Sequence, residues 1–154
     1  MVRFKNRYVL INLMFNPNLI NLQTDELINL NSKEILESIR HSILQHFGEL
    51  NLGQSTASLN IKYYSPITSL LILRCSRDSI SIVRVALMLI RQIKGHDVIF
   101  QSINVSGTMR KTQEAAIRFD RELVLQHSTN ISSSTLTDPK EIQTRHETIL
   151  NIEI

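Results

Sequence analysis

The spacing of apolar residues along the chain alternates between a period of two and a period near 3.6. Residues 57–64 alternate apolar and polar side chains, which predicts a strand with one face on a core, whereas apolar residues recur at helical spacing from 32 to 47. Turn and cap residues separate these segments, and Gly48 and Gly95 are expected to end helices. The pattern predicts strands at 8–15, 57–64, 67–75 and 97–106 and helices at 32–47, 77–94, 111–127 and 138–154.

This order of elements predicts an α+β fold. Strand, helix, strand, strand, helix and strand make a ferredoxin-like, RNA-recognition-module-like αβ sandwich, a four-stranded antiparallel sheet with helices on one face plus a C-terminal helical extension. Residues 1–129 are expected to form a single sandwich domain with a basic N-terminal arm, followed by a Ser/Thr-rich linker at 130–137 and a C-terminal helix at 138–154. Because this frame carries acylphosphatases, metabolite sensors and RNA-recognition modules alike, it does not fix the function.

The expected helix at 77–94 is unusually apolar. Its apolar positions cover well over half of the circumference, whereas packing on one sheet needs a stripe of roughly 100°. We interpret the excess as a protein interface, although the helix at 111–127 could equally cover it. The residues predicted to meet another protein are Ile82, Val85, Leu89 and Ile93.

The charge distribution, the cysteine count and the length of the apolar stretches limit the classes of protein to which this chain can belong. The net charge is only +3, but basic residues dominate residues 1–8 and 71–121, which allows a one-sided basic surface suited to phosphate contact. Cys75 is the one cysteine, so an intramolecular disulfide is impossible and the sequence fits a reducing compartment. No stretch reaches the roughly 18 to 20 apolar residues that cross a bilayer, so no membrane association is expected.

No constellation of residues predicts an active site. The five histidines lack metal-ligand spacing, and the four glycines stand singly, so neither a metal centre nor a phosphate loop is expected. Glu34 and Glu37 share a helix surface that a solvated face explains, and they do not make a general acid/base pair. We therefore expect no catalytic residues, no metal site and no cofactor in this chain.

RNA binding has better support from the sequence. The strand at 67–75 contains no aromatic residue or glycine, so stacking of bases on the sheet is not expected, and phosphate contacts remain. Basic residues alternate along the N-terminal arm, and two more begin the helix after the turn at Gly107, where the helix dipole disfavours cations unless an anion is bound. A frayed terminus or ordinary solvated charge would explain the same pattern. The predicted RNA contacts are Arg3, Lys5, Arg7, Arg74, Arg77, Gly107, Thr108, Arg110 and Lys111.

Four short strings carry a resemblance to a known family. Residues 2–8 (VRFKNRY), 61–68 (IKYYSPIT), 73–77 (LRCSR) and 106–110 (SGTMR) resemble the Pop-five-type protein subunit of eukaryotic ribonuclease P and ribonuclease MRP. The resemblance spans residues 2 to about 125. It implies the same αβ sandwich and a component of an endoribonuclease holoenzyme in the nucleus and nucleolus.

The resemblance also implies partners. Members of this family assist a catalytic RNA that removes the 5′ leader of precursor tRNA, and rRNA processing is implied as well. The expected partners are therefore the catalytic RNA, the other protein subunits and, indirectly, precursor tRNA. The magnesium ions of the reaction belong to the RNA, so a non-catalytic role of binding and stabilising the RNA is expected for this chain.

Two other functions remain open at this point. A stand-alone RNA-binding module would need aromatic residues on its sheet to stack bases, which the sequence does not provide. A hydrolase of the acylphosphatase type would need a glycine-rich anion loop after the first strand, and residues 16–20 contain neither glycine nor arginine.

Overall fold

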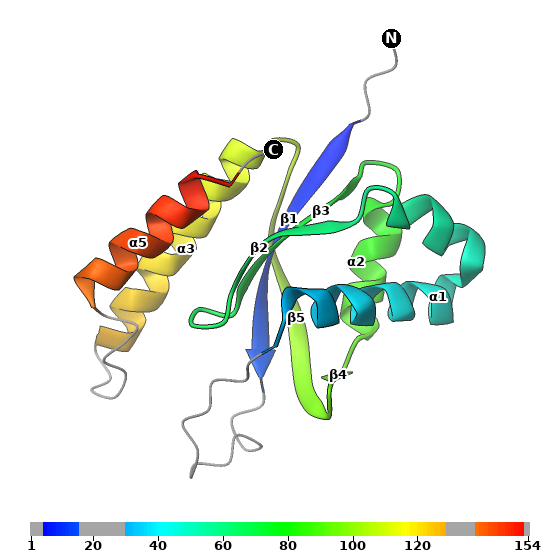
Figure 1. The fold of residues 1–154 in the computed structure, drawn as a ribbon, viewed down its shortest axis with the longest axis horizontal. Coiled ribbons are helices and arrows are strands. Elements are labelled where there is room, and N and C mark those ends of the chain that lie inside the picture. Colours follow the sequence, from blue (N-terminus) through cyan, green and yellow to red (C-terminus); the bar gives the residue numbers. More distant parts are fainter. Residues whose placement is uncertain (1–4, 16–29, 129–137, 153–154) are drawn as a thin grey trace.

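Figure 1 shows the computed structural model, which describes residues 5–15, 30–128 and 138–152. One antiparallel sheet has the strand order β2-β3-β1-β5-β4, with α1 and α2 on one face and α3 and α5 on the other (Figure 1). The elements are β1 (Asn6–Phe15), α1 (Ser32–Thr56), β2 (Asn60–Ser65), β3 (Leu70–Ser76), α2 (Ile80–Leu89), β4 (Gln92–Ile93), β5 (His96–Ser106), α3 (Met109–Ser128) and α5 (Pro139–Leu150).

The two central strands are buried on both faces, which explains why their sequences are nearly continuous apolar runs. In β1, Val9 and Ile11 enter the core under α1 and α2, whereas Tyr8 and Leu10 enter a second core under α3 and α5. The strand β3 alternates in the same way, and its hairpin with β2 forms as predicted. The predicted α+β class is confirmed.

The helix α1 begins with a reciprocal cap. The Asn31 side chain accepts a hydrogen bond from the backbone N–H of Lys33, and the Glu34 carboxylate accepts one from the Asn31 N–H at 3.0 Å. Gly48 has φ 79° and ψ 176°, which interrupts the helix where the sequence predicts its end. The chain then re-enters a helical conformation and continues to Thr56, a segment that the sequence pattern did not reveal.

The prediction of a helix at 77–94 and of four strands is wrong. The helix α2 covers only Ile80–Leu89, and β4 pairs with the start of β5 to give a fifth strand. Lys94 and Gly95 both have positive φ, the conformation of a tight two-residue hairpin turn, so Gly95 turns a hairpin and does not end a helix.

The prediction of helices on one face alone is also wrong, because α3 and α5 pack on the second face. Gln113 of α3 donates through Nε2 to the carbonyl oxygens of Ile149 at 2.9 Å and Leu150 at 3.2 Å. These hydrogen bonds satisfy carbonyl groups in the last turn of α5 that have no partner within the helix. The nearly inaccessible Asp120 carboxylate lies 3.3 Å from Arg145 Nε, and a separate oxygen lies 2.8 Å from the ring of His146. These polar contacts fix α5 on α3. The linker predicted at 130–137 lies outside the described residues.

Candidate nucleic-acid interface

Three strands bring separate basic segments to one end of the sheet. β1 begins where β3 and β5 end, since Asn6 is paired with Ser76 and Tyr8 is paired with Ser106. The pairing continues past the strands, because the Arg77 N–H donates to the Lys5 carbonyl oxygen at 2.8 Å. We call this surface the basic end, and its cations are Lys5, Arg7, Arg74, Arg77, Arg110 and Lys111.

Arg7 and Gly107 lie against each other in the basic end. Arg7 is half-buried and donates through Nη1 to the Asn6 carbonyl oxygen at 3.1 Å. A methyl group added at Gly107 would come within 3.1 Å of Arg7 Nη1, which is tighter than ordinary packing. Glycine at this position therefore leaves room for the guanidinium beside the turn that follows β5.

Arg74 and Arg77 flank the end of β3. Arg74 lies between Tyr8 of β1 and Asn60 of β2 in the sheet, and its buried Nε has no hydrogen-bond partner among the described residues. Arg77 is exposed, with Asp78 as the next residue. Within the part of the chain that the structure describes, neither arginine forms an ion pair, so both retain charge available to a ligand.

The start of α3 completes the basic end. Its first turn contains Arg110 and Lys111 and no acidic residue, although such a position favours anions. Arg110 Nε lies 3.4 Å from the carboxylate of Glu114, but the arginine side chain stays 89% exposed, so the pair is weak. The Thr108 N–H already donates to Ser106 Oγ at 3.3 Å, which leaves fewer free donors at this turn than the sequence suggested.

The structure thus brings together every predicted RNA contact that it describes; Arg3 lies outside the described residues. The predicted protein contacts are divided. Val85 and Leu89 are 45% and 44% exposed on α2 and Ile82 is half-buried, but Ile93 is 2% exposed in β4 and belongs to the core. Met88, 77% exposed on the same helix, was missed, although its apolar side chain was the available signal.

Two tyrosines of the sheet are directed into the core beneath α3 and α5, whereas Tyr64 and Phe15 are half-buried. Tyr8 is 4% exposed beneath α3 and α5, and Tyr63 packs against the same core, where burial raises its pKa. The absence of base stacking on the sheet stays a prediction.

The described residues also offer little for covalent or metal chemistry. Burial raises the pKa of the Cys75 thiol to about 11, against the opposing effect of Arg7, so the thiol stays protonated near neutral pH. No group of three His, Cys, Asp or Glu residues in the described ranges is placed to hold a metal ion. None of the helices in those ranges combines the length and apolar character needed to cross a bilayer.

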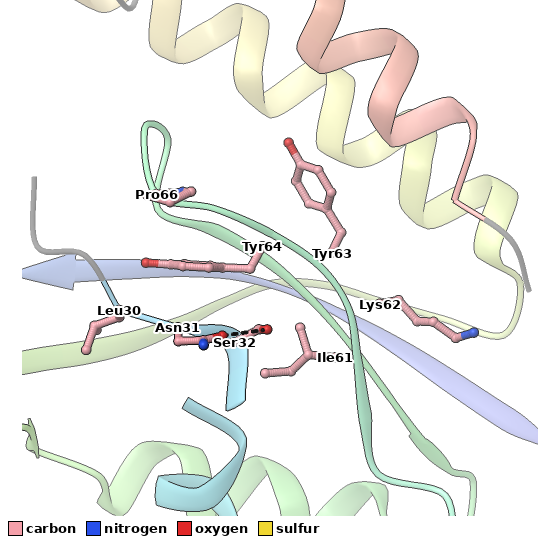
Figure 2. Close-up of a pocket in the computed structure, with 8 residues that line it drawn as sticks. All are labelled: Leu30, Asn31, Ser32, Ile61, Lys62, Tyr63, Tyr64 and Pro66. Carbon is pink, nitrogen blue, oxygen red and sulfur yellow. Dashed lines mark hydrogen bonds between the residues drawn. The ribbon is translucent and has the colours of Figure 1, made fainter. Parts of the chain in front are cut away.

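One pocket of about 500 Å³ lies between the start of α1 and the strand β2. Figure 2 shows Tyr64 and Leu30 at its border, with Tyr63 directed away toward α3 and α5. The polar groups that it draws from the start of α1 are already engaged, since Asn31 accepts from Ser32 Oγ at 3.3 Å and caps α1. The pocket therefore contains no free helix N-terminus for an anion, and it includes none of the cations of the basic end.

Comparisons with known proteins identify the family of the chain. The model of the Rpp14/Pop5 family matches residues 7–117, a range that includes the sheet, α1, α2 and most of the basic end. The chain is 35% identical over 136 residues to the probable ribonuclease P/MRP protein subunit POP5 of Arabidopsis thaliana, covering 88% of this chain and 90% of that protein.

Two further relatives extend the similarity. The ribonuclease P/MRP protein subunit POP5 of Schizosaccharomyces pombe is 37% identical over 122 residues, 76% of this chain and 86% of its own. Ribonuclease P protein component 2 of Methanocaldococcus jannaschii is 32% identical over 112 residues, 73% of this chain and 72% of its own. The chain belongs to the Rpp14/Pop5 family.

Proposed function

We propose that this chain is a non-catalytic protein subunit of ribonuclease P, and also of ribonuclease MRP, that binds and stabilises the catalytic RNA. The relatives that carry these names support the assembly. The observation that carries RNA binding is the basic end, where six cations from three separate parts of the sequence converge. The order β1-α1-β2-β3-α2-β5 further supports a ferredoxin-like frame, here with β4 added at one edge.

Phosphate contact follows from the chemistry of the basic end. Lysine and arginine bind phosphate oxygens by charge and hydrogen bonds, which position a protein on folded RNA and read little base sequence. Arg7 is already ordered by Asn6 and the space at Gly107, so less side-chain entropy is lost when it binds. The exposed Lys5, Arg77 and Lys111 would add charge around it.

The proposal assigns precursor-tRNA 5′ leader removal and rRNA processing to the assembly, and it assigns magnesium to the RNA. The chain would supply positive charge and shape, acting on precursor tRNA indirectly and residing in the nucleus and nucleolus. The exposed side chains of Val85, Met88 and Leu89 on α2 would contact another protein subunit.

The test is affinity purification of the tagged chain from its own cells, with sequencing of the bound RNA and an assay of precursor-tRNA cleavage before and after nuclease treatment. One structured RNA whose destruction abolishes cleavage is the expected result. Many unrelated RNAs, or none, would contradict the proposal and favour a stand-alone RNA-binding module.

Charge reversal at matched lysines sharpens this test. Lys111 and Lys33 are both exposed in the first turn of a helix, but only Lys111 lies at the basic end. Lys111→Glu is expected to reduce the recovered RNA, whereas Lys33→Glu should leave it unchanged. Equal losses from both variants would mean that overall charge matters and the basic end does not.

A further inference from the structure

We infer that the open edge of β5 binds an extended segment of another protein subunit, which adds to the sheet as a strand. The inference rests on the proposed function, since it requires that the chain work inside a multi-protein assembly. It concerns a surface distinct from the basic end, and this surface adjoins the exposed side chains of α2 at Met88.

The edge is long because β4 covers so little of it. β5 pairs with β1 from Val98 to Ser106, but on its other side β4 pairs only with His96 and Asp97 (Figure 1). Beyond that point, no other described strand is hydrogen-bonded to this side of β5. Residues 99–105 therefore form an unpaired edge within the described part of the chain.

Two hydrogen bonds establish which backbone groups face the open side. The Val98 N–H donates to the Arg91 carbonyl oxygen at 2.9 Å, away from β1. Leu13 of β1 lies opposite Phe100, and its N–H donates to the Ser69 carbonyl oxygen at 2.8 Å, on the side away from β5. Leu13 and Phe100 therefore do not exchange backbone hydrogen bonds. Because outward and inward groups alternate along a strand, the backbone N–H and C=O of Phe100 and Ser102 point to the open edge.

The open edge lacks the charged residues and prolines that protect exposed strands, although its register with β1 shifts at Ile103. Residues 99–105 read IFQSINV and contain no charged residue, proline or glycine. The opposite edge strand, β2, is six residues long, contains Lys62 and is followed directly by Pro66. Proteins guard free edges with such short strands, lysines and prolines, so the β2 edge is built to stay free and the β5 edge to be paired.

The surroundings of the edge specify the partner segment. A groove of about 1040 Å³ includes Met88 of α2 and Ile99 of β5, which are 77% and 66% exposed. Phe100 enters the core under α1 and α2, so its neighbour Ile99 points to the opposite face of the sheet. An added strand would therefore cover Met88 with one set of alternate side chains and Ile99 with the other.

The groove also includes the exposed Arg91. The neighbouring carboxylate of Asp97 accepts a hydrogen bond from Gln92 and does not pair with this arginine. Acidic residues in the partner segment would therefore complement the charge of Arg91.

The positive charge of Arg91 favours a different protein, and not a second copy of the chain, as the occupant of the edge. The β5 sequence after Asp97 contains no carboxylate up to Ser106, so a second β5 would bring no negative charge to Arg91. We therefore assign the edge to an extended, partly acidic segment of another subunit.

The experiment compares three variants at one exposed edge residue. Ser102→Pro removes an outward N–H, Ser102→Lys introduces a guarding charge and keeps the N–H, and Ser102→Ala is the matched control. Each tagged full-length variant is purified from cells, and its protein subunits are quantified relative to the bound RNA. Thermal unfolding checks that each variant folds, and Ser102→Lys decides the question should the proline variant not fold.

The expected result is at least a tenfold loss of one protein subunit from Ser102→Pro and Ser102→Lys, with RNA retained and Ser102→Ala unchanged. In the assembly, the amide hydrogens of Phe100 and Ser102 should also become protected from exchange. A full set of subunits on the proline and lysine variants would overturn the inference. So would a homodimer of the isolated wild-type chain that Ser102→Pro dissociates, because the occupant would then be a second copy. Wild-type protein that recovers neither RNA nor subunits would refute the proposed function itself.

Discussion

Neutralising three cations of the basic end should flatten the salt dependence of RNA binding. Lys5, Arg77 and Lys111 are exposed, and none forms an ion pair within the described residues, so their replacement by glutamine breaks no internal salt bridge. Each phosphate contact changes the slope of log K against log salt by about 0.7 for single-stranded RNA and about 0.9 for a duplex. The triple variant should therefore lose about 2 to 2.7 units of slope.

This slope can be converted into affinity. Over a fourfold change in salt, a slope of about 2 to 2.7 corresponds to about 20- to 40-fold. Wild-type affinity should thus fall about 20- to 40-fold further than that of the triple variant between about 50 and 200 mM salt, and the two proteins should converge at high salt. The assay is filter binding or fluorescence anisotropy with the structured RNA that copurifies with the chain.

A control variant separates local from global charge. Lys33, Arg121 and Lys140 are exposed away from the basic end and form no ion pair within the described residues, and their joint replacement by glutamine removes the same net charge. An unchanged slope in the basic-end variant, or an equal change in the control, would refute the assignment of phosphate contacts to the basic end.

Three other predictions concern groups inside the fold. Asp120→Ala removes the carboxylate that binds an arginine and a histidine of α5, and should lower the free energy of unfolding by about 3 kcal/mol in urea titrations, whereas Glu114→Ala should cost under about 0.5 kcal/mol. Gly107→Ala should fold normally and weaken RNA binding about threefold, because the added methyl group shifts the Arg7 side chain. The same substitution should have no further effect on RNA binding in an Arg7→Gln background. If the two losses of affinity add, the contact between Gly107 and Arg7 does not contribute to RNA binding. Because the folded Cys75 thiol has a pKa of about 11, alkylation at pH 8 should proceed only as fast as unfolding. Stability should also fall as pH rises from about 9 to about 11, where only the unfolded thiol ionises.

Most of the sheet could be predicted because each strand has a distinct apolar pattern. The nearly continuous apolar runs of β1 and β3 correspond to burial on both faces, and the alternation in β2 to an edge strand. The error at α2 has a local cause. Ile90 and Ile93 continue the helical spacing of apolar residues and are buried, so they resemble further helix. The helix ends because Ile90 is extended, with φ −73° and ψ 121°, and the hairpin that follows turns at Lys94 with a positive φ that lysine rarely adopts.

The layer arrangement could not be predicted for a different reason. An amphipathic stripe on α3 indicates that the helix packs on something, but not which face of the sheet receives it. The second face is apolar at Leu10, Leu70 and Ile72, yet in a central strand such residues look the same whether helices or ligands cover them. Composition alone therefore could not distinguish a sheet open on one side from this covered one.

The candidate site was predictable as residues but not as a surface. Arg7, Arg74 and Arg110 are far apart in the sequence, and nothing in their spacing indicates that they meet. Their convergence is a consequence of register, because the antiparallel pairing of β1 with β3 and β5 sets the start of one strand beside the ends of two others.

The covered sheet explains why binding should occur at its ends and edges. With α1 and α2 on one face and α3 and α5 on the other, the described sheet can meet a ligand mainly where strands terminate or lack a neighbour. Strand ends present long basic side chains, which suits phosphates, whereas a strand edge presents backbone donors and acceptors, which suits another polypeptide. The basic end and the β5 edge thus have different chemistry, and one chain could contact RNA and a protein neighbour at the same time.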